Sequence, residues 1–225
     1  MTRSISPIRT RGARAGLDLA KIVRAARGLA PVNLTMKAVA AALGVDPKAL
    51  NYHVENRESL LALVAADAFT ANFATVRIPD DCSWQDACRI FAAGLAASLI
   101  ETSQLVEHFR LGHSLATGFL EPGESILKKM IAAGFGEETA ARLSLLLGNI
   151  CIGYARDYVI ASRDGRVLAE NLHDAIEASN GQDFENLSRV LKAGVAIDSE
   201  TQLGLSIDVF LRGAEAVLFR GTPGR

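Results

Sequence analysis

The sequence is 225 residues long, and its composition, 49% hydrophobic and 22% charged, is that of an ordinary soluble globular protein with one large domain or two small ones. No apolar run reaches the roughly 18 uncharged residues that suggest a membrane span, so we expect no association with a membrane. The three cysteines are an odd number without a CxxC pair, which argues against a disulfide framework and a structural zinc site and favours the reducing cytoplasm.

The net charge of −1 conceals an asymmetry along the chain. Residues 1–60 hold ten Lys and Arg but only four Asp and Glu, a net charge of +6, so the remainder carries −7. A basic front can bind a polyanion, whereas an acidic rear avoids one. Residues 1–15 contain four of these arginines and no apolar stretch, which predicts a flexible basic arm rather than a secretory signal.

Apolar residues at helical spacing predict four helices in the front of the chain. Thr35 precedes the second of them, and Gly44 follows it as a C-terminal glycine would. Asp46 can cap the third helix, whose first position suits Pro47, and Asn56 can cap the fourth. The expected ranges are about 17–29, 35–43, 46–53, and from 56 to a point before Pro79.

The second and third helices have the spacing of a helix-turn-helix. A helix of about two turns ends at Leu43, a tight turn spans 44–46, and a second short helix begins at Pro47. Small or apolar residues are needed where two such helices touch. Those suited to this contact are Ala40, Ala41, Val45 and, as the buried anchor of the second helix, Leu50.

The second helix of such a motif presents its first residues to the major groove of DNA. Lys48 can donate to guanine or to phosphate, and Asn51 can pair with adenine. Residues placed to contact the phosphate backbone are Tyr52, His53, Lys37 and Arg57. The alternative is a short surface helix between two core helices, because this geometry also occurs in proteins that bind no DNA.

Residues 17–69 resemble the N-terminal domain of tetracycline-repressor-like (TetR family) regulators. The matching residues are Leu34-Thr35, Val39-Ala40, Leu43-Gly44-Val45, Leu50, Tyr52-His53-Val54, Asn56-Arg57 and Leu60-Leu61. The resemblance implies a three-helix DNA-binding head that a long fourth helix joins to a helical ligand-binding body. It also implies a homodimer that binds a palindromic operator in double-stranded DNA and represses nearby genes until a small-molecule effector releases it.

The resemblance also implies, position by position, which residues contact DNA. They are Lys37, Pro47, Lys48, Ala49, Asn51, Tyr52, His53 and Arg57. The chain departs from the family at Asn51, where members most often carry Tyr. Asn is shorter and polar, so the operator sequence that this protein reads should differ from theirs.

The rear of the chain also shows helical signals and no alternating strand pattern, so the expected fold class is all-α. A linker is expected at 77–82, where Pro79 is followed by two Asp. The domains are then an arm at 1–15, a DNA-binding domain at 16–76 that includes the fourth helix, and a ligand-binding and dimerisation domain at 83–221. Rear helices are expected near 84–101, 103–118, 123–133, 137–163, 184–193 and 199–220, with breaks at 121–123, 134–136 and 164–165.

Two of these helices, 137–163 and 199–220, show apolar residues on more than one stripe and must be covered on more than one side. Two such helices from each of two subunits would form a four-helix interface, and the resemblance implies that they form the dimer bundle. A dimer also suits the DNA-binding motif, because paired recognition helices reach half-sites about 34–36 Å apart. The alternative is that both helices belong to the internal core of a monomer.

A small-molecule site is expected in the rear domain, where a few polar groups accompany apolar residues. The candidate ligand-binding residues are Phe91, Leu95, Leu105, Phe109, His113, Thr117, Met130, Asn149 and Tyr154. Each of them taken alone is more often a core residue than a ligand contact. The rear histidines do not match the positions that hold magnesium–tetracycline in the family, so we expect a moderately apolar organic effector and neither a metal nor a cofactor.

The rival class of protein is an enzyme, and no sequence pattern favours it. Cys82 follows two Asp, a setting unsuited to a nucleophilic thiolate, and Cys151 lies in an apolar run. The GxSxG, P-loop, HExxH and GxGxxG motifs are absent. We therefore expect no enzyme. Two alternatives remain: a helical dimeric protein with a non-regulatory small-molecule-binding role, and a structural helical dimer without affinity for DNA.

Overall fold

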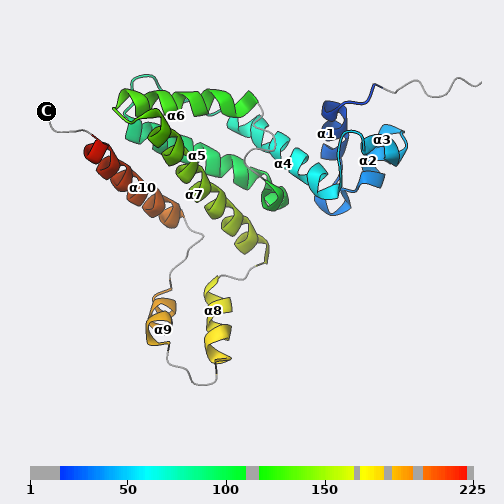
Figure 1. Ribbon diagram of the computed structural model, residues 1–225. Coiled ribbons are helices and arrows are strands. Elements are labelled where there is room, and N and C mark those ends of the chain that lie inside the picture. The colour runs from blue at the N-terminus through cyan, green and yellow to red at the C-terminus, as the bar shows by residue number, and fades with distance from the viewer. Residues whose placement is uncertain (1–15, 110–116, 165–167, 180–183, 195–199, 222–225) are drawn as a thin grey trace, which may run out of the picture. The chain divides into compact units, whose positions relative to one another are not determined.

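A computed structural model describes residues 16–109, 117–164, 168–179, 184–194 and 200–221 (Figure 1). Every regular element within these ranges is a helix, which confirms the all-α fold class. Among the described residues, no helix combines the length and the apolar character needed to cross a membrane.

The contacts divide the chain into two compact units, Met1–Val64 and Ala65–Arg225. The sequence had suggested a boundary at the linker 77–82. The division falls instead within helix α4, Arg57–Phe73, so one continuous helix belongs to both units. It contributes buried leucines to the front core and buried phenylalanines to the rear core.

The described residues of the front unit form three short α-helices, one 3-10 helix and the start of α4 (Figure 1). They are α1, Leu19–Arg27; the 3-10 helix η1, Pro31–Asn33; α2, Met36–Leu43; and α3, Pro47–Leu50. Helix α2 contacts both α1 and α3. Ile22, Val39 and Leu50 are fully buried, so one small apolar core holds the three helices together.

The front helices begin where side chains can cap them. Thr35 Oγ1 accepts a hydrogen bond from the backbone N–H of Ala38 at 3.1 Å, which caps α2. Asp46 Oδ1 accepts one from the N–H of Lys48 at 2.8 Å, with Pro47 at the first position of α3. These caps confirm the starts that the sequence predicted for both helices.

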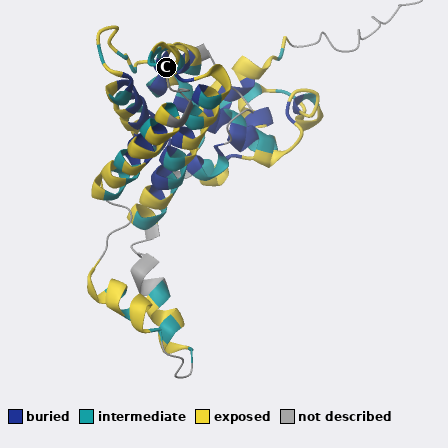
Figure 2. Ribbon diagram, turned by 60° about the vertical axis from the view of Figure 1, so that its left-hand side comes forward, coloured by how far each residue is buried: buried dark blue, intermediate teal, exposed yellow. Residues whose placement is uncertain are grey.

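The rear unit is built around α5. Its elements after α4 are α5, Trp84–Glu101; the 3-10 helices η2, Ser103–His108, and η3, Thr117–Phe119; α6, Leu120–Ala132; α7, Glu137–Asp164; α8, Leu168–Glu177; α9, Glu185–Lys192; and α10, Glu200–Gly221. Helix α5 contacts α6, α7 and α10, and Figure 2 shows the buried residues on the inner faces of these helices. This packing makes α5 the centre of the rear core.

Polar pairs attach α10 to α5. The side-chain amide of Gln85 donates to Glu215 at 2.9 Å, and Arg89 pairs with Asp208 at 2.7 Å. Phe210 of α10 is buried. Because Arg89 and Asp208 are half exposed, we expect this pair to orient α10 more than to stabilise it.

The helix expected at 103–118 was wrong in type. Ser103–His108 forms a 3-10 helix, and Ser103 has φ 52°, a conformation that interrupts the α-helix after α5. Residues 110–116 lie outside the described part of the chain. The break expected at 121–123 was also wrong, since α6 starts at Leu120. Pro122 is tolerated in its first turn, because the backbone N–H groups there have no carbonyl partner within the helix.

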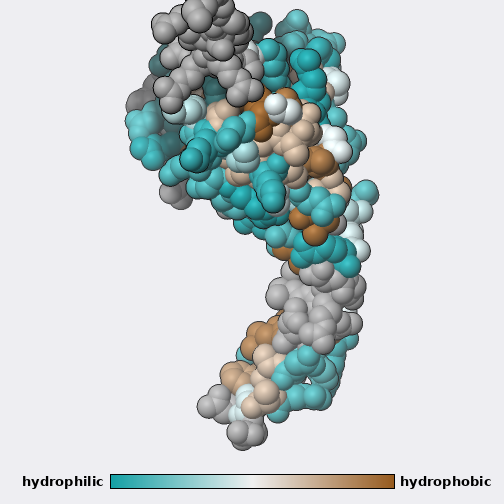
Figure 3. All heavy atoms as spheres, turned by 90° about the vertical axis from the view of Figure 1, so that its right-hand side faces the viewer, coloured by the Kyte–Doolittle hydropathy of each residue, from teal (hydrophilic) through white to brown (hydrophobic). Residues whose placement is uncertain are grey.

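Helices α8 and α9 contact each other, and α8 was not predicted from the sequence. No residue of α9 is buried (Figure 2). Leu187 and Val190 are large apolar residues of this helix that are exposed. Figure 3 shows apolar atoms of this pair, in the lower part of the view, open at the surface beside hydrophilic ones.

Candidate nucleic-acid interface

A glycine in the left-handed conformation makes the turn between α2 and α3. Gly44 has φ 66° and ψ 29°, and its N–H donates to the carbonyl of Ala41 at 3.1 Å. The N–H of Val45 reaches the carbonyl of Ala40 at 3.0 Å, which completes the end of α2. A Cβ at residue 44 would meet no neighbour within 4 Å, so the backbone conformation alone requires glycine here.

The contact between α2 and α3 uses fewer residues than expected. Leu50 is fully buried and anchors α3, as predicted, and Ala40 is buried in α2. Ala41 is exposed, so its expected place at the helix contact was wrong. On a helix of eight residues the buried face is narrow, and Val39 and Ala40 fill it.

The residues after the turn are presented to the surface. Helix α3 ends at Leu50, shorter than the expected 46–53, and the N–H groups of His53 and Val54 both donate to the Leu50 carbonyl at 2.8 Å. This continues the chain as a turn from Asn51 to His53. The exposed members of the predicted DNA-binding set are Lys37, Pro47, Lys48, Asn51, Tyr52, His53 and Arg57, and Ala49 is half-buried.

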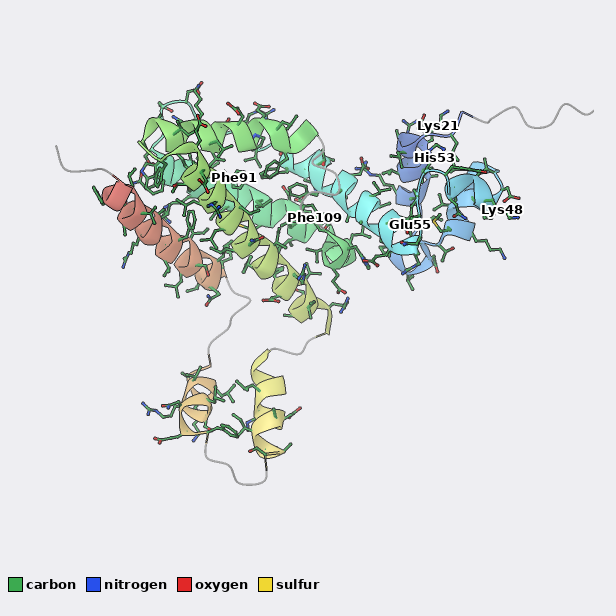
Figure 4. All side chains as sticks on the ribbon, in the orientation of Figure 1. Lys21, Lys48, His53, Glu55, Phe91 and Phe109 are labelled. Carbon is green, nitrogen blue, oxygen red and sulfur yellow. The ribbon has the colours of Figure 1, made fainter. Side chains whose placement is uncertain are left out.

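Tyr52 and Lys48 are both exposed in the segment that follows the Gly44 turn. Tyr52 is 90% exposed, which the packing of this chain does not explain for a large aromatic side chain. Figure 4 shows Lys48 at the surface of the front unit, pointing away from its helices. Together they give the turn after Gly44 an aromatic group and a cation that are free to meet a partner.

Most of the net positive charge of the front, +4 of +6, is carried by residues 1–15, outside the described part of the chain. Four of its ten basic residues are arginines at 1–15, which the structure does not describe. Within 16–64, six basic residues face four acidic ones, and two of the acids, Asp18 and Asp46, accept hydrogen bonds as helix caps. The described head is therefore only mildly basic, and its exposed cations matter individually.

Arg57 has a role that the sequence did not indicate. Its Nε donates to the carbonyl of Leu34 at 2.8 Å, and its Nη2 donates to the carbonyl of Pro31 at 3.3 Å. These bonds join the first residue of α4 to the loop before α2. The sequence missed them because backbone acceptors more than twenty residues away leave no residue pattern.

The predicted ligand-binding residues fall into three groups. Those buried in the rear core are Phe91, Leu95, Leu105, Phe109, Met130 and Tyr154. His113 and the side chain of Thr117 lie outside the described residues. Asn149 is exposed on α7, so the structure does not bring it together with the buried group.

Two members of the buried group, Phe91 and Phe109, belong to a larger aromatic cluster. Phe91 lies edge-on to Phe73 with ring centroids 5.4 Å apart, and Phe109 lies 4.8 Å from Phe69 (Figure 4 labels Phe91 and Phe109). Phe119 adds a further ring, 5.6 Å from Phe73. Sequence reasoning missed Phe69, Phe73 and Phe119, although the spacing of two phenylalanines four residues apart on a helix indicated a shared face.

Two of the cysteines, Cys88 and Cys151, are fully buried in the rear core. Burial raises the pKa of Cys88 and of Cys151 to about 12. The Cys151 thiol donates to the carbonyl of Ala92 at 3.5 Å. Groups that stay protonated at neutral pH are poor nucleophiles, so neither thiol is suited to covalent catalysis.

Comparison with known proteins rests on structure alone. No family model matches the chain, and no curated protein matches its sequence. Solved structures do match. Apo ActR from Streptomyces coelicolor is 23% identical with a TM-score of 0.71, over 91% of this chain and 99% of ActR. A possible TetR family transcriptional regulator from Streptomyces coelicolor A3(2) is 22% identical with a TM-score of 0.70, over 89% of this chain and 100% of that one.

This chain has the TetR fold. A third similar structure is TetR-Q116A from Acinetobacter baumannii AYE in complex with minocycline, 19% identical with a TM-score of 0.62, over 93% of this chain and 98% of that one. ActR has also been solved in complex with actinorhodin and with (S)-DNPA. The TetR fold spans both units, so it extends the resemblance at residues 17–69 to about nine-tenths of the chain.

Proposed function

We propose that the protein is a ligand-responsive transcriptional regulator. It binds a palindromic operator in double-stranded DNA as a homodimer and represses transcription until a small organic effector releases it. The observation that carries this proposal is the surface after the Gly44 turn, where Lys48, Asn51 and Tyr52 are exposed within a TetR fold. Similar structures are regulators, which supports a binding protein over an enzyme.

Each exposed residue of this surface has a role in the proposed complex. Lys48 and Asn51 read base edges, because an amine donates to guanine and an amide pairs with adenine. Tyr52, His53 and Lys37 contact phosphates and set the register of the head on the duplex. Pro47 and Ala49 line the same surface and present small apolar groups to the groove, where Ala can contact a thymine methyl.

A second copy of the chain is the partner that we propose for α7 and α10. Apolar side chains on both helices are exposed, including Leu145, Leu146 and Val209. Gly153 of α7 and Gly213 of α10 stand in helix interiors, where glycine costs about 1 kcal/mol, and a Cβ at either would meet nothing within 4 Å. A close approach by the helices of a partner subunit gives both features a reason.

Asn149 belongs to this face rather than to the effector site. It lies four residues after Leu145 on α7, so both share one side of the helix. The effector is proposed to bind among the buried aromatic residues of the rear core instead. The complexes of ActR with actinorhodin and of TetR-Q116A with minocycline support an organic effector by analogy of fold.

Selection of DNA by the full chain tests this function. Random-sequence duplexes are incubated with the protein, and bound DNA is amplified and sequenced over several rounds. We expect an inverted repeat whose half-sites are about one helical turn apart or a multiple of it, bound with an affinity that falls as salt rises. Enrichment of no sequence, with binding that does not depend on salt, would favour a helical dimer with a non-regulatory small-molecule-binding role.

A further inference from the structure

We propose that Arg57 is a positioning residue of the DNA-binding head: it holds the loop before α2 in place through two backbone carbonyls rather than contacting a phosphate. This inference rests on the proposed DNA-binding function. It reassigns a residue that sequence position alone places among the phosphate contacts.

The guanidinium of Arg57 donates hydrogen bonds to two backbone carbonyls of the segment 31–34. Nε donates to the carbonyl of Leu34 at 2.8 Å, and Nη2 donates to that of Pro31 at 3.3 Å. The Pro31 carbonyl also accepts the N–H of Leu34 at 3.2 Å, so the three groups close a compact network around η1. Hydrogen bonds from a charged donor are stronger than neutral ones, and a guanidinium offers them in a fixed, planar arrangement.

The segment 31–34, to which Arg57 is hydrogen-bonded, directly precedes the start of α2. Leu34 is 1% exposed, so its side chain is anchored in the core while its carbonyl is held by Arg57. The next residue, Thr35, caps α2, and Lys37 lies exposed in the first turn. The position of this loop therefore decides where α2 begins and where Lys37 points.

The effect extends from α2 to the proposed reading surface. Helix α2 contacts α3, and only the short turn at 44–46 connects the two helices. A loop that moves before α2 shifts the helix that braces Lys48 and Asn51. Arg57 is thus placed to control DNA affinity without touching DNA.

Salt dependence separates this role from a phosphate contact. Each phosphate contact contributes about 0.9 to the slope of log affinity against log salt, and a bracing residue contributes nothing to it. The affinity of the full chain for its selected duplex is measured from 50 to 200 mM NaCl, for the wild type and for Arg57→Ala, Arg57→Lys and Lys37→Ala. The same variants are checked for folding by circular dichroism at the assay temperature.

We expect Arg57→Ala to weaken binding about tenfold with an unchanged slope. Arg57→Lys should not restore affinity, because one ammonium group cannot reproduce the two hydrogen bonds that Nε and Nη2 of the guanidinium donate. Lys37→Ala should lower the slope by about 0.9, as a phosphate contact does. A slope that falls by this amount in Arg57→Ala and recovers in Arg57→Lys would overturn the proposal.

Asn56→Ala is the matched control for stability. Asn56 Oδ1 accepts the N–H of Ser59 at 2.8 Å and so caps the same helix start. Its replacement should lower thermal stability but leave the affinity within about twofold of the wild type. An equal loss of affinity in Asn56→Ala and Arg57→Ala would mean that Arg57 acts through stability alone, against the proposal.

A measurement on the free protein keeps the two hypotheses apart. The side-chain Nε–H of Arg57 should exchange slowly with water in the NMR spectrum of the full chain, because it is held by a carbonyl. If the wild type binds no duplex, the proposed regulatory function is wrong. Slow exchange of the Arg57 Nε–H would then still show that Arg57 is hydrogen-bonded to the loop before α2. Fast exchange in a protein that does bind DNA would refute the positioning role alone.

Discussion

Lys48 in α3 and Asn51, directly after this helix, are three residues apart, and both side chains are exposed. Their chemistry differs. The amine of Lys48 is a compact donor that serves guanine or phosphate, whereas the amide of Asn51 offers one donor and one acceptor in the arrangement that adenine matches. Specificity should therefore depend more on Asn51, and general affinity more on Lys48.

Replacement of either residue by Ala tests this division. Asn51→Ala should weaken binding to the selected duplex by about 1–3 kcal/mol while leaving binding to random DNA nearly unchanged. Lys48→Ala should weaken both, with the larger loss on the selected duplex. Binding is measured by fluorescence anisotropy on both duplexes at one salt concentration, with the exposed Lys192 of α9 replaced by Ala as a charge-matched control. Equal losses on every sequence for both variants would contradict base reading.

The buried thiols allow a further prediction at this scale. Alkylation requires a thiolate, and burial raises the pKa of Cys88 and Cys151 to about 12. We expect iodoacetamide at pH 8 to modify these two residues only after denaturant unfolds the rear unit. Mass spectrometry of the labelled peptides, with and without denaturant, checks this. Rapid labelling of either thiol in the native protein would show that the core around α5 opens.

At the scale of elements, the helix-turn-helix depends on a single backbone conformation. Gly44 adopts φ 66° with open space around it, so a substitution there acts through the backbone and not through a clash. Gly44→Ala should lower the free energy of unfolding of the head by about 1 kcal/mol. Gly44→Asn should cost less, because Asn tolerates the left-handed region. Denaturant unfolding followed by circular dichroism compares the two, and an equal cost would show that the conformation is not what matters.

Whole-molecule behaviour depends on what covers α7 and α10. Val209 is 63% exposed on α10, and Val190 is 55% exposed on α9. Val209→Asp should weaken the dimer by about 3 kcal/mol, because a carboxylate would be buried without a partner. Val190→Asp introduces the same charge at a similar exposure and should leave the dimer intact. Analytical ultracentrifugation over a range of concentrations measures both, and a wild type that is monomeric throughout would contradict the proposed dimer.

Much of the front unit could be predicted from the sequence because its signals are local. Thr35, Gly44, Asp46 and Pro47 each act on a backbone within a few residues, so their types alone locate both ends of α2 and the start of α3. The rear helices 84–101 and 137–163 were also predicted nearly to the residue, since each carries a long apolar periodicity.

Only the tertiary structure decided the rest, because those features join residues that are distant in the chain. The aromatic cluster brings Phe69 and Phe73 to Phe91 and Phe109 from separate elements. The sequence by itself determined where α2 ends, where α3 begins and which side chains are exposed after that turn. The fold decided that Arg57 turns inward to two carbonyls, because a hydrogen bond across more than twenty residues exists only once the chain has folded.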